Sequence, residues 1–340
     1  MTMHDQTKTL PPFPPLAFGP VEIGFPVVQA ALAGYSDWPM RLVASRLGAP
    51  FTYSQAMLAR FVVQIARGRR AGRLVRPTGE GALGGAQLMG GDDEELGAAA
   101  CWLAGTGFHA VDVNLACPVK KVLGRRRGGH LMGRPGAAVE IVARLRDALP
   151  PAVPVTVKMR RGLDDSTESR DAFFTILDGV LRSGAAAVTV HGRTVRQRYE
   201  GRSSWQFLRE VKRHAGGAVV LGSGDLFTAA DCLEMLRRTG VDGVAVARGA
   251  IGNPWIFRQI RALASGEPCP QPSLGEQREV MVEHYRLAEE TYGPRRTGPI
   301  MRKFGIHYAR LHPQAAEVRE AFIQVRCQDD WRRVLEQWYG

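Results

Sequence analysis

The feature that most constrains the fold is a short apolar run followed by a helical stretch, repeated eight times. The runs are β-branched or apolar segments of four or five residues, at 27–31, 51–54, 84–88, 110–114, 155–159, 187–191, 219–223 and 243–246. Helical stretches lie between them, for example at 92–106, 136–149, 169–183, 204–214 and 227–239. In the first stretch Asp92, Asp93, Glu94 and Glu95 crowd the start, where negative charge suits the helix dipole. Eight such units favour an α/β fold, a closed (β/α)8 TIM barrel, over an open sheet.

The segments before and after the eight repeats lack the strand and helix alternation of the barrel. Residues 1–20 carry five prolines and read as a tail without regular structure. The stretch 265–273 (SGEPCPQPS) reads as a linker, and the helical segments expected after it are 274–291, 296–312 and 314–338. We therefore expect a tail (1–20), a barrel domain (21–264) and a small helical domain (265–340).

Net charge suggests a polyanionic partner. The chain carries a formal charge of +12, and a surplus of this size favours nucleic acid as a partner, although a general preference for arginine would produce the same number. There is no apolar run long enough for a transmembrane helix and no signal-peptide pattern, so we expect a cytoplasmic protein that does not enter the membrane. The five cysteines form no CxxC pair, so neither a metal site nor a disulfide framework is expected.

The helical domain combines arginine with aromatic residues, a combination that suits RNA phosphates and exposed bases. The residues are Arg295, Arg296, Arg302, Lys303, Arg310, Arg326, Arg332 and Arg333, with Tyr285, Tyr292, His307 and Tyr308. The alternative is a helical cap with a solvated basic face and core aromatics.

Residues able to do chemistry follow the apolar runs, where barrel enzymes have their active sites. Cys117 comes just after the fourth run, in AVDVNLACP. A thiol with an ordinary pKa near 8.5 is protonated at neutral pH and can donate a proton. Lys120 and Lys121 could lower that pKa and favour a nucleophile instead. A buried structural cysteine is the alternative, but Asn114 and Pro118 flank this thiol where the strand ends.

Other run ends favour a flavin. Lys158 could offer positive charge to a flavin ring, and a neutral His191 could hydrogen-bond a flavin or a pyrimidine carbonyl. GSGD (222–225) and ARGA (247–250) follow the last two runs, where barrels commonly bind phosphate with backbone N–H groups. With no GxGxxG fingerprint in the first unit, flavin mononucleotide (FMN) is the natural ligand.

Ordered blocks along most of the chain resemble the dihydrouridine synthase family, in its bacterial branch. They are AALAGYSD (30–37), AQLMG (86–90), DVNLACPVKKV (112–122), GGHLM (128–132), VTVKMRRG (155–162), VHGRT (190–194), GSGDL (222–226), ARGAIGNPWIF (247–257) and MRKFGIHY (301–308). The resemblance implies an FMN-dependent oxidoreductase (EC 1.3.1.-) that reduces uridines of tRNA to 5,6-dihydrouridine. NADPH would reduce the flavin, N5 of the flavin would pass hydride to C6 of an extruded uracil, and Cys117 would protonate C5.

The resemblance also assigns the remaining site residues. Those expected at FMN are Ala31, Leu32, Gln87, Lys158, His191, Ser223, Gly224, Asp225, Ala247, Arg248 and Gly249. Those expected at the RNA are Asn114, Arg193, Arg302 and Lys303, with Asn114, His191 and Arg193 orienting the base. We expect a monomer with no metal.

Several positions depart from the family pattern and mark a divergent member. Ala31 and Leu32 replace a proline and a methionine, and Gln55 stands where glutamate is common. Ala116, Ser223 and Ala247 replace a glycine, an asparagine and a glycine. Two alternatives stay open: an RNA-binding protein without reductase activity, and a flavin barrel that reduces a free pyrimidine.

Overall fold

Eight parallel strands close into a barrel in the computed structural model, which describes residues 13–68, 74–79, 81–91 and 95–340. The strands pair in the circular order β3, β4, β6, β7, β8, β9, β10, β11 and back to β3. The expected (β/α)8 barrel is therefore confirmed, and every strand lies within two residues of its predicted run. The strands are β3 (Val27–Gln29), β4 (Phe51–Tyr53), β6 (Leu83–Met89), β7 (Ala110–Leu115), β8 (Val155–Arg160), β9 (Ala187–His191), β10 (Val220–Ser223) and β11 (Gly243–Val246).

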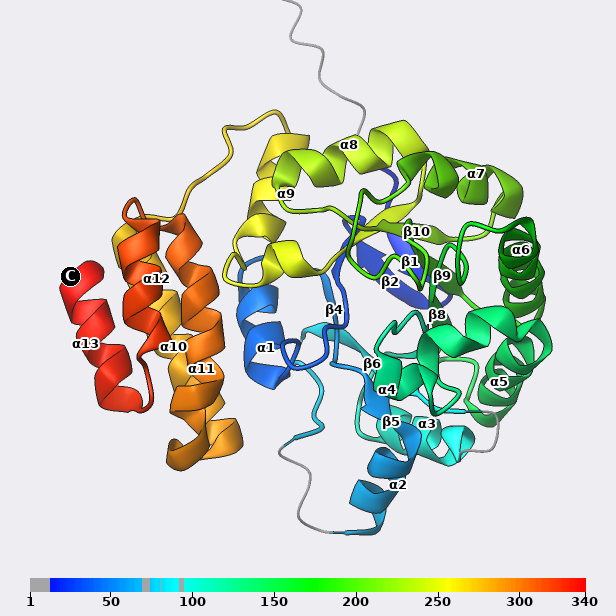
Figure 1. The fold of residues 1–340 in the computed structure, drawn as a ribbon, viewed down its shortest axis with the longest axis horizontal. Helices are drawn as coiled ribbons and strands as arrows, with labels where there is room; N and C mark the ends of the chain where they lie inside the picture. The colour runs from blue at the N-terminus through cyan, green and yellow to red at the C-terminus, as the bar shows by residue number, and fades with distance from the viewer. Residues whose placement is uncertain (1–12, 69–73, 80, 92–94) are drawn as a thin grey trace, which may run out of the picture.

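A ring of helices surrounds the strands (Figure 1). It is formed by α1 (Trp38–Arg46), α3 (Leu96–Gly105), α5 (Pro135–Ala148), α6 (Thr167–Arg182), α7 (Trp205–Ala215), α8 (Ala229–Thr239) and α9 (Ile256–Ala264). Ser166, Ser204 and Thr228 cap α6, α7 and α8 by accepting from backbone N–H groups of the first turn, which explains where these helices begin. The predicted acidic start at 92–94 lies outside the described residues. Short elements add to the ring: β5 (Met57–Leu58), α2 (Ala59–Arg67), α4 (Lys120–Leu123), and 3-10 turns at Gly128–Gly133 and Arg248–Ala250.

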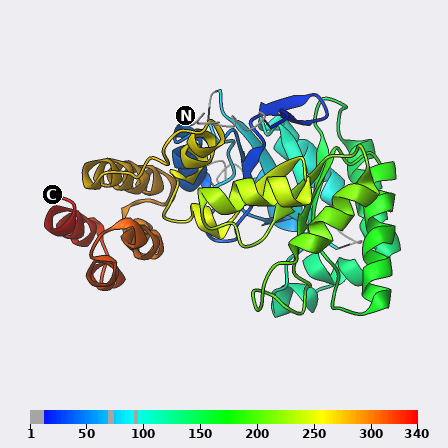
Figure 2. The ribbon, with the colours of Figure 1, turned by 90° about the horizontal axis from the view of Figure 1, so that it is seen from above.

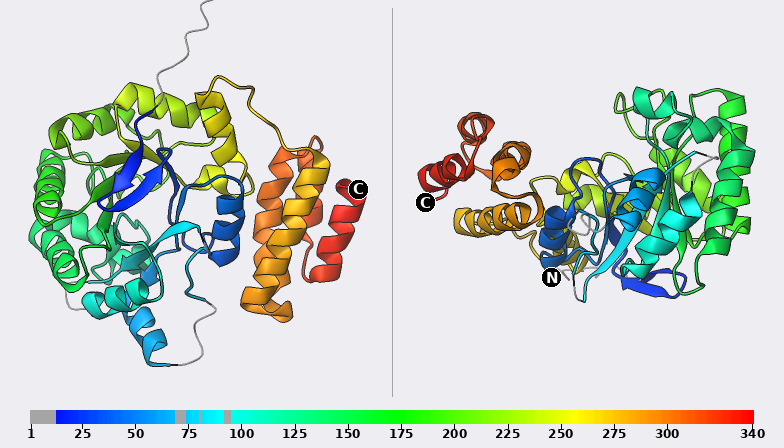
Figure 3. Two further views of the ribbon diagram at one scale, coloured as in Figure 1. Left: turned by 180° about the vertical axis from the view of Figure 1, so that it is seen from behind. Right: turned by 90° about the horizontal axis from the view of Figure 1, so that it is seen from below.

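The N-terminal segment is not wholly irregular. Strands β1 (Leu16–Phe18) and β2 (Val21–Gly24) form an antiparallel hairpin, so the prediction that residues 1–20 hold no regular element is wrong for 16–18. Leu16 and Phe18 are buried against barrel residues such as Phe51. Figure 3 shows the hairpin across the end of the barrel that faces away from the viewer in Figure 1. It therefore plugs the amino-terminal end of the barrel, and residues 1–12 lie outside the described part.

Alternation along the strands decides which side chains enter the barrel. On β7, Ala110 packs in the interior cluster, so Asp112 and Asn114 share that inward direction. Thr156 on β8 donates to Asp112 at 2.7 Å, and the hydroxyl of Tyr53 on β4 lies 2.9 Å from that of Thr156. A polar layer thus crosses the middle of the barrel, and the next inward residues beyond it open at the carboxyl ends of the strands.

Four helices follow the barrel: α10 (Leu274–Tyr292), α11 (Pro294–Tyr308), α12 (Ala315–Ile323) and α13 (Gln328–Trp338). The prediction of one helix over 314–338 is wrong, because the chain breaks between α12 and α13. The Asp330 carboxylate accepts from the backbone N–H groups of Arg326 and Cys327 and starts a new helix there. The break lets Trp331 pack on Phe322, with ring centroids 5.0 Å apart. No helix among the described residues combines the length and apolar character of a membrane span.

The four helices dock on one side of the barrel, beside α1 and α9 (Figures 1 and 2). The Tyr292 hydroxyl donates to the buried Asp37 carboxylate at 2.7 Å. Lys303 donates to the carbonyl of Gly34 in the loop after β3, and its ammonium lies 4.8 Å from the ring centre of Tyr35. Contacts of this kind fix the helices to the loop that leads into the barrel mouth.

Candidate functional site at the carboxyl ends of the strands

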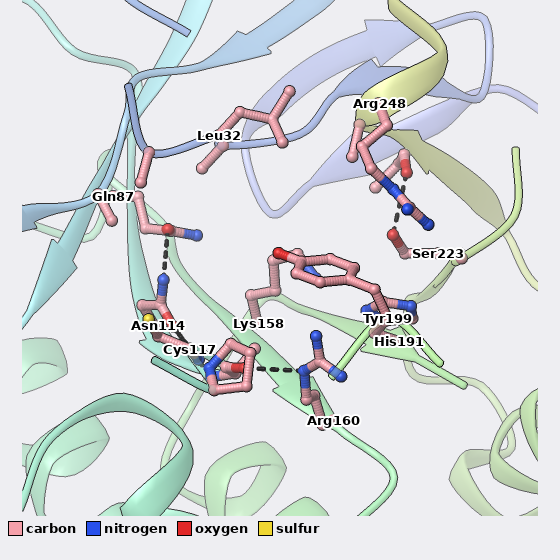
Figure 4. Close-up of a pocket in the computed structure, with 18 of the residues that line it drawn as sticks. Leu32, Gln87, Asn114, Cys117, Lys158, Arg160, His191, Tyr199, Ser223 and Arg248 are labelled. Atoms are coloured by element: carbon pink, nitrogen blue, oxygen red, sulfur yellow. Dashed lines mark hydrogen bonds between the residues drawn. The ribbon is translucent and has the colours of Figure 1, made fainter. Parts of the chain in front are cut away.

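A cavity of about 380 Å³ opens at the carboxyl ends of the strands (Figure 4). This volume lies in the range of small-molecule sites. Its lining includes twelve of the residues predicted from the sequence: Ala31, Leu32, Gln87, Asn114, Cys117, Lys158, His191, Ser223, Gly224, Asp225, Ala247 and Arg248. These residues come from seven strands and the turns after them, so barrel closure brings together side chains up to 217 positions apart.

A chain of hydrogen bonds positions the turn that carries Cys117. The Gln87 amide donates to Asp112 at 2.7 Å and accepts from the Asn114 amide at 2.7 Å. The Asn114 oxygen then accepts from the backbone N–H groups of Ala116 and Cys117, both at 3.0 Å. The NH2 group and the oxygen of each side-chain amide thus have separate partners, so these hydrogen bonds hold the end of β7 in one geometry. Asn114, predicted to orient a base, here positions the thiol.

The environment keeps Cys117 protonated. Burial raises the pKa of the Cys117 thiol above its ordinary value, opposed by a hydrogen bond from the Val119 backbone and by the nearby Arg160 charge. The cation close enough to act is therefore Arg160, whereas Lys120 and Lys121, which the sequence offered for that role, are exposed. A thiol of raised pKa is a proton donor at neutral pH and a poor nucleophile.

Arg160 is a site residue that sequence patterns did not reveal. It is buried at the end of β8 and donates to the carbonyl of Ala116 at 2.9 Å (Figure 4). It also donates to the carbonyls of Thr194 and Arg198, at 2.8 and 2.6 Å. One guanidinium thus ties the Cys117 turn to the loop after β9. The available signal was its position: Arg160 has the same inward direction as Lys158, two residues earlier.

Lys158 places a half-buried cation in the cavity. Burial, reinforced by Arg160, lowers the pKa of Lys158 to about 8, and Asp112 opposes the shift. Among the described residues, no hydrogen-bond acceptor or ion-pair partner contacts its ammonium group. Burial and the charge of Lys158 lower the pKa of His191 to about 2, so its imidazole is neutral at physiological pH. The floor of the cavity therefore combines one cation with a neutral hydrogen-bonding ring.

The loops after β10 and β11 present backbone N–H groups beside a positive side chain. In the described part of the chain, the N–H groups of Gly224, Asp225 and Arg248 donate to no acceptor. Gly224 has φ +115°, and a Cβ atom there would come within 2.3 Å of the Ser203 hydroxyl, so only glycine fits. Free N–H groups beside an arginine form an anion site. This end of the cavity suits a phosphate.

Two aromatic residues at the mouth were also missed. Tyr199 and Phe227 line the cavity, yet their side chains are 56% and 45% exposed. The Arg248 guanidinium lies 4.9 Å from the Tyr199 ring centre and 5.1 Å from that of Phe227. Arg160 lies 5.6 Å from the Tyr199 ring centre. Cation–π contacts of this kind hold an exposed ring in place, and nothing in the local sequence distinguished these two rings from core aromatics.

Four predicted residues do not line the cavity. Arg193 is buried behind the wall, where it forms an ion pair with Asp225 at 2.8 Å and donates to carbonyls of the 200–201 turn. Its guanidinium also lies 3.4 Å from Nε2 of the cavity residue His191, and the expected contact with a base stays a prediction. A Cβ atom on Gly249 would lie 2.2 Å from the Leu226 carbonyl oxygen, so Gly249 allows two loops to pack. Arg302 and Lys303 lie on α11, outside the cavity.

No group of three or more His, Cys, Asp or Glu side chains suited to a metal ion occurs in the part of the chain that the structure describes.

Comparisons with known proteins agree with this architecture. Residues 28–338 match the family described as "Dihydrouridine synthase (Dus)". A "Probable tRNA-dihydrouridine synthase" of Rickettsia conorii is 33% identical over 308 residues, covering 90% of this chain and 91% of that protein.

Two solved structures share the fold at low sequence identity. A morphinone reductase variant in complex with tetrahydroNAD has a TM-score of 0.55 and 16% identity, over 74% of this chain and 90% of that one. The 6-hydroxypseudooxynicotine amine oxidase of Pseudomonas geniculata has a TM-score of 0.57 and 16% identity; it covers 80% of this chain, which spans about half (52%) of that longer protein. Together with the motifs in the cavity, the family match shows that the chain belongs to the dihydrouridine synthase family of oxidoreductases.

Proposed function

We propose that this protein reduces uridines in tRNA to 5,6-dihydrouridine, with FMN as its cofactor and NADPH as the reductant. The observation that carries the proposal is the presence of a protonated thiol and a half-buried, unpaired cation in one cavity. Cys117 is held protonated at the end of β7, and Lys158 offers an unpaired ammonium from the neighbouring strand β8. Reduction of a pyrimidine double bond needs a hydride and a proton: Cys117 can supply the proton, and Lys158 can help to hold the cofactor that would supply the hydride.

The residues present fit FMN. The free N–H groups of Gly224, Asp225 and Arg248 suit its phosphate, with Arg248 adding charge. Lys158 and His191 suit the polar edge of the ring, and a half-buried ammonium without a partner is costly unless a ligand contacts it. We assign Ala31, Leu32, Gln87, Ser223 and Ala247 to the surrounding wall. Bound FMN would supply the hydride for C6 of the base.

Cys117 performs the acid step in this proposal. As C6 gains the hydride, C5 becomes basic and takes the proton of the Cys117 thiol. Asn114 accepts from the backbone N–H of Cys117 and Arg160 donates to the Ala116 carbonyl, so the turn that carries the sulfur is held in place and the proton is offered at a defined position. Extrusion of the base is required, because C5 and C6 are shielded while the base is stacked in folded RNA.

The helical region contributes to RNA binding in this proposal through Arg302, which is exposed on α11. Lys303 acts there through the Gly34 loop that it holds. We also propose that the protein acts on tRNA in the cytoplasm as a monomer.

The test is a Cys117→Ala variant, with Cys101→Ala as the matched control. Cys101 is an exposed thiol on α3, remote from the cavity. Purified Cys117→Ala should keep the flavin absorption spectrum and lose dihydrouridine formation on tRNA by about 100-fold or more, the contribution of a positioned acid. Cys101→Ala should match the parent in both measurements. Undiminished product from Cys117→Ala would refute the acid assignment, and a colourless parent protein that binds tRNA would favour an RNA-binding protein without reductase activity.

A further inference from the structure

The positive charge of this protein does not lie where its arginine-rich carboxyl-terminal sequence suggests. Residues 265–340 contain eleven Lys and Arg and eleven Asp and Glu, so this region is formally neutral. The whole net charge of +12 therefore belongs to residues 1–264. An RNA partner that responds to the net charge has to contact the barrel.

Within the barrel, two loops at the mouth of the cavity concentrate exposed cations. They are the connection from β7 to α5, residues 116–134, and the connection from β9 to α7, residues 192–204. The first contains no acidic residue, and the second contains only Glu200. Exposed cations with no ion-pair partner among the described residues gather at 120–126 and 198–202 of these loops. We call them the mouth surface: Lys120, Lys121, Arg125, Arg126, Arg198 and Arg202.

The two loops are built as one unit. Arg160 joins them, since it donates to the Ala116 carbonyl in the first loop and to the Thr194 and Arg198 carbonyls in the second. A Cβ atom on Gly129 would come within 2.9 Å of the Val195 side chain, so the loops also pack directly on each other. The two loops that carry the mouth surface are therefore joined to each other at their bases.

Backbone conformation singles out the same loops. Outside glycine, positive φ occurs at three residues in the described part of the chain: Arg126, Arg198 and Asp225. The left-handed conformation favours glycine or asparagine, and arginine there carries a cost. Arg126 and Arg198 have exposed side chains that form no ion pair within the described part of the fold. Their contribution to folding does not explain the choice of arginine, whereas a bound polyanion does.

We propose that the mouth surface binds the RNA backbone on both sides of the target uridine and supplies most of the electrostatic affinity for RNA. This inference rests on the proposed function and deepens it. Val119 and Tyr199 line the cavity, so the cations of residues 120–126 and 198–202 lie next to the mouth through which a base would enter. Charge complementarity and proximity to the mouth therefore favour RNA phosphate as the occupant.

Salt dependence of binding tests the proposal directly. Binding of an unmodified tRNA transcript to the full-length protein is measured by fluorescence anisotropy at several KCl concentrations. Removing one contact between a cation and a phosphate reduces the slope of log K against log salt by about 0.7 to 0.9. Arg125→Gln/Arg126→Gln and Arg198→Gln/Arg202→Gln should each reduce the slope by about 1.5 and weaken binding several-fold. Glutamine and arginine both have a Cβ atom and meet the same steric cost at the positive φ of positions 126 and 198, so loss of charge is the main change.

Two matched pairs serve as comparisons. Arg182→Gln/Arg213→Gln removes two exposed charges in the last turns of α6 and α7, at the opposite end of the barrel, and should leave the slope unchanged. Arg302→Gln/Arg326→Gln removes two exposed charges from the helical region and should reduce the slope by less than either mouth pair. The proposal is overturned if the mouth pairs keep the parent slope, or if the helical pair has the larger effect. Dihydrouridine formation by the parent is scored separately, so failure of the proposed function is visible on its own.

Discussion

The helical region (residues 265–340) has ten arginines and the mouth surface has four, and the two sets differ in what those arginines do. In the helical region, Arg286, Arg332 and Arg333 form ion pairs with acidic residues three or four positions away, and the region as a whole is formally neutral. On the mouth surface no such acids are present. Arginine content therefore does not measure the charge available to a partner; the arrangement of neighbouring carboxylates decides it.

The two regions also differ in how they are held. The helical region is docked on the barrel through polar contacts such as the hydrogen bond from the Tyr292 hydroxyl to the buried Asp37. Even Lys303, expected from the sequence to grip RNA, donates to the Gly34 carbonyl, and burial lowers its pKa. The mouth loops are instead organised from inside by Arg160. The comparison assigns a structural task to one set of cations and a recognition task to the other.

The largest effect is expected from a variant that separates the two mouth loops and leaves the helical region unchanged. Arg160→Gln removes the donor that links the carbonyls of Ala116, Thr194 and Arg198. Displacement of a catalytic group by about 1 Å costs on the order of 100-fold in rate. Dihydrouridine formation in single turnover should fall by about that factor, with flavin content retained. Arg160→Lys keeps a charge but lacks the planar fork, so it should restore little of the rate. A parent-like rate in Arg160→Gln would show that the mouth loops hold Cys117 without this link.

The second prediction weakens the contact between the helical region and the barrel and leaves the mouth surface unchanged. Tyr292→Phe removes the hydroxyl that donates to Asp37, whose pKa burial raises. Loss of a hydrogen bond to a buried carboxylate should lower the free energy of unfolding by about 1 to 3 kcal/mol, measured by urea denaturation. The control is Tyr339→Phe, since the Tyr339 hydroxyl is buried without a partner, and stability there should not fall. The salt slope for RNA should stay at the parent value in both variants. A reduced slope in Tyr292→Phe would mean that the helical region carries RNA charge contacts after all.

The sequence was sufficient for the barrel because strand and helix periods are local signals. Inward and outward alternation then follows, so the run ends that hold Gln87, Asn114, Lys158 and His191 were found together in one cavity. The division between α12 and α13 was not predicted, because an apolar helical pattern continues across it and the break depends on Asp330 capping and on Trp331 packing.

Other features of the site depend on contacts distant in sequence. Arg160 acts on carbonyls 34 to 44 positions away, and no local pattern shows that a guanidinium is enclosed by backbone oxygens. The family resemblance placed Arg193 near the base, but only the fold shows its ion pair with Asp225 of a different loop. The residue types at the strand ends were enough to predict where the site lies. The hydrogen-bond and ion-pair partners of each charged side chain could be found only from the structure.

The smallest effect is expected from a change of pH, which alters the charge of Lys158 in the cavity and leaves the histidines of the helical region neutral. In the helical region, burial lowers the pKa of His284 to about 3 and the pKa of His307 to about 4, so both rings stay neutral above pH 6. In the cavity the pKa of Lys158 is lowered to about 8. Raising the pH from 7 to 9 therefore discharges Lys158, and FMN affinity, followed by fluorescence quenching, should fall by at most about tenfold, the limit set by one pH unit above that pKa.

The flavin-free protein should show the opposite sign. Its folded Lys158 releases its proton near pH 8, whereas the unfolded lysine keeps it until about 10.5. Between these values the unfolded state binds more protons, so the Lys158 contribution to the free energy of unfolding rises with pH. Lys158→Met removes both trends and is the matched control. If FMN affinity is flat from pH 7 to 9 in the parent and in Lys158→Met alike, Lys158 does not contact the flavin, and the assignment of the unpaired cation to cofactor binding fails.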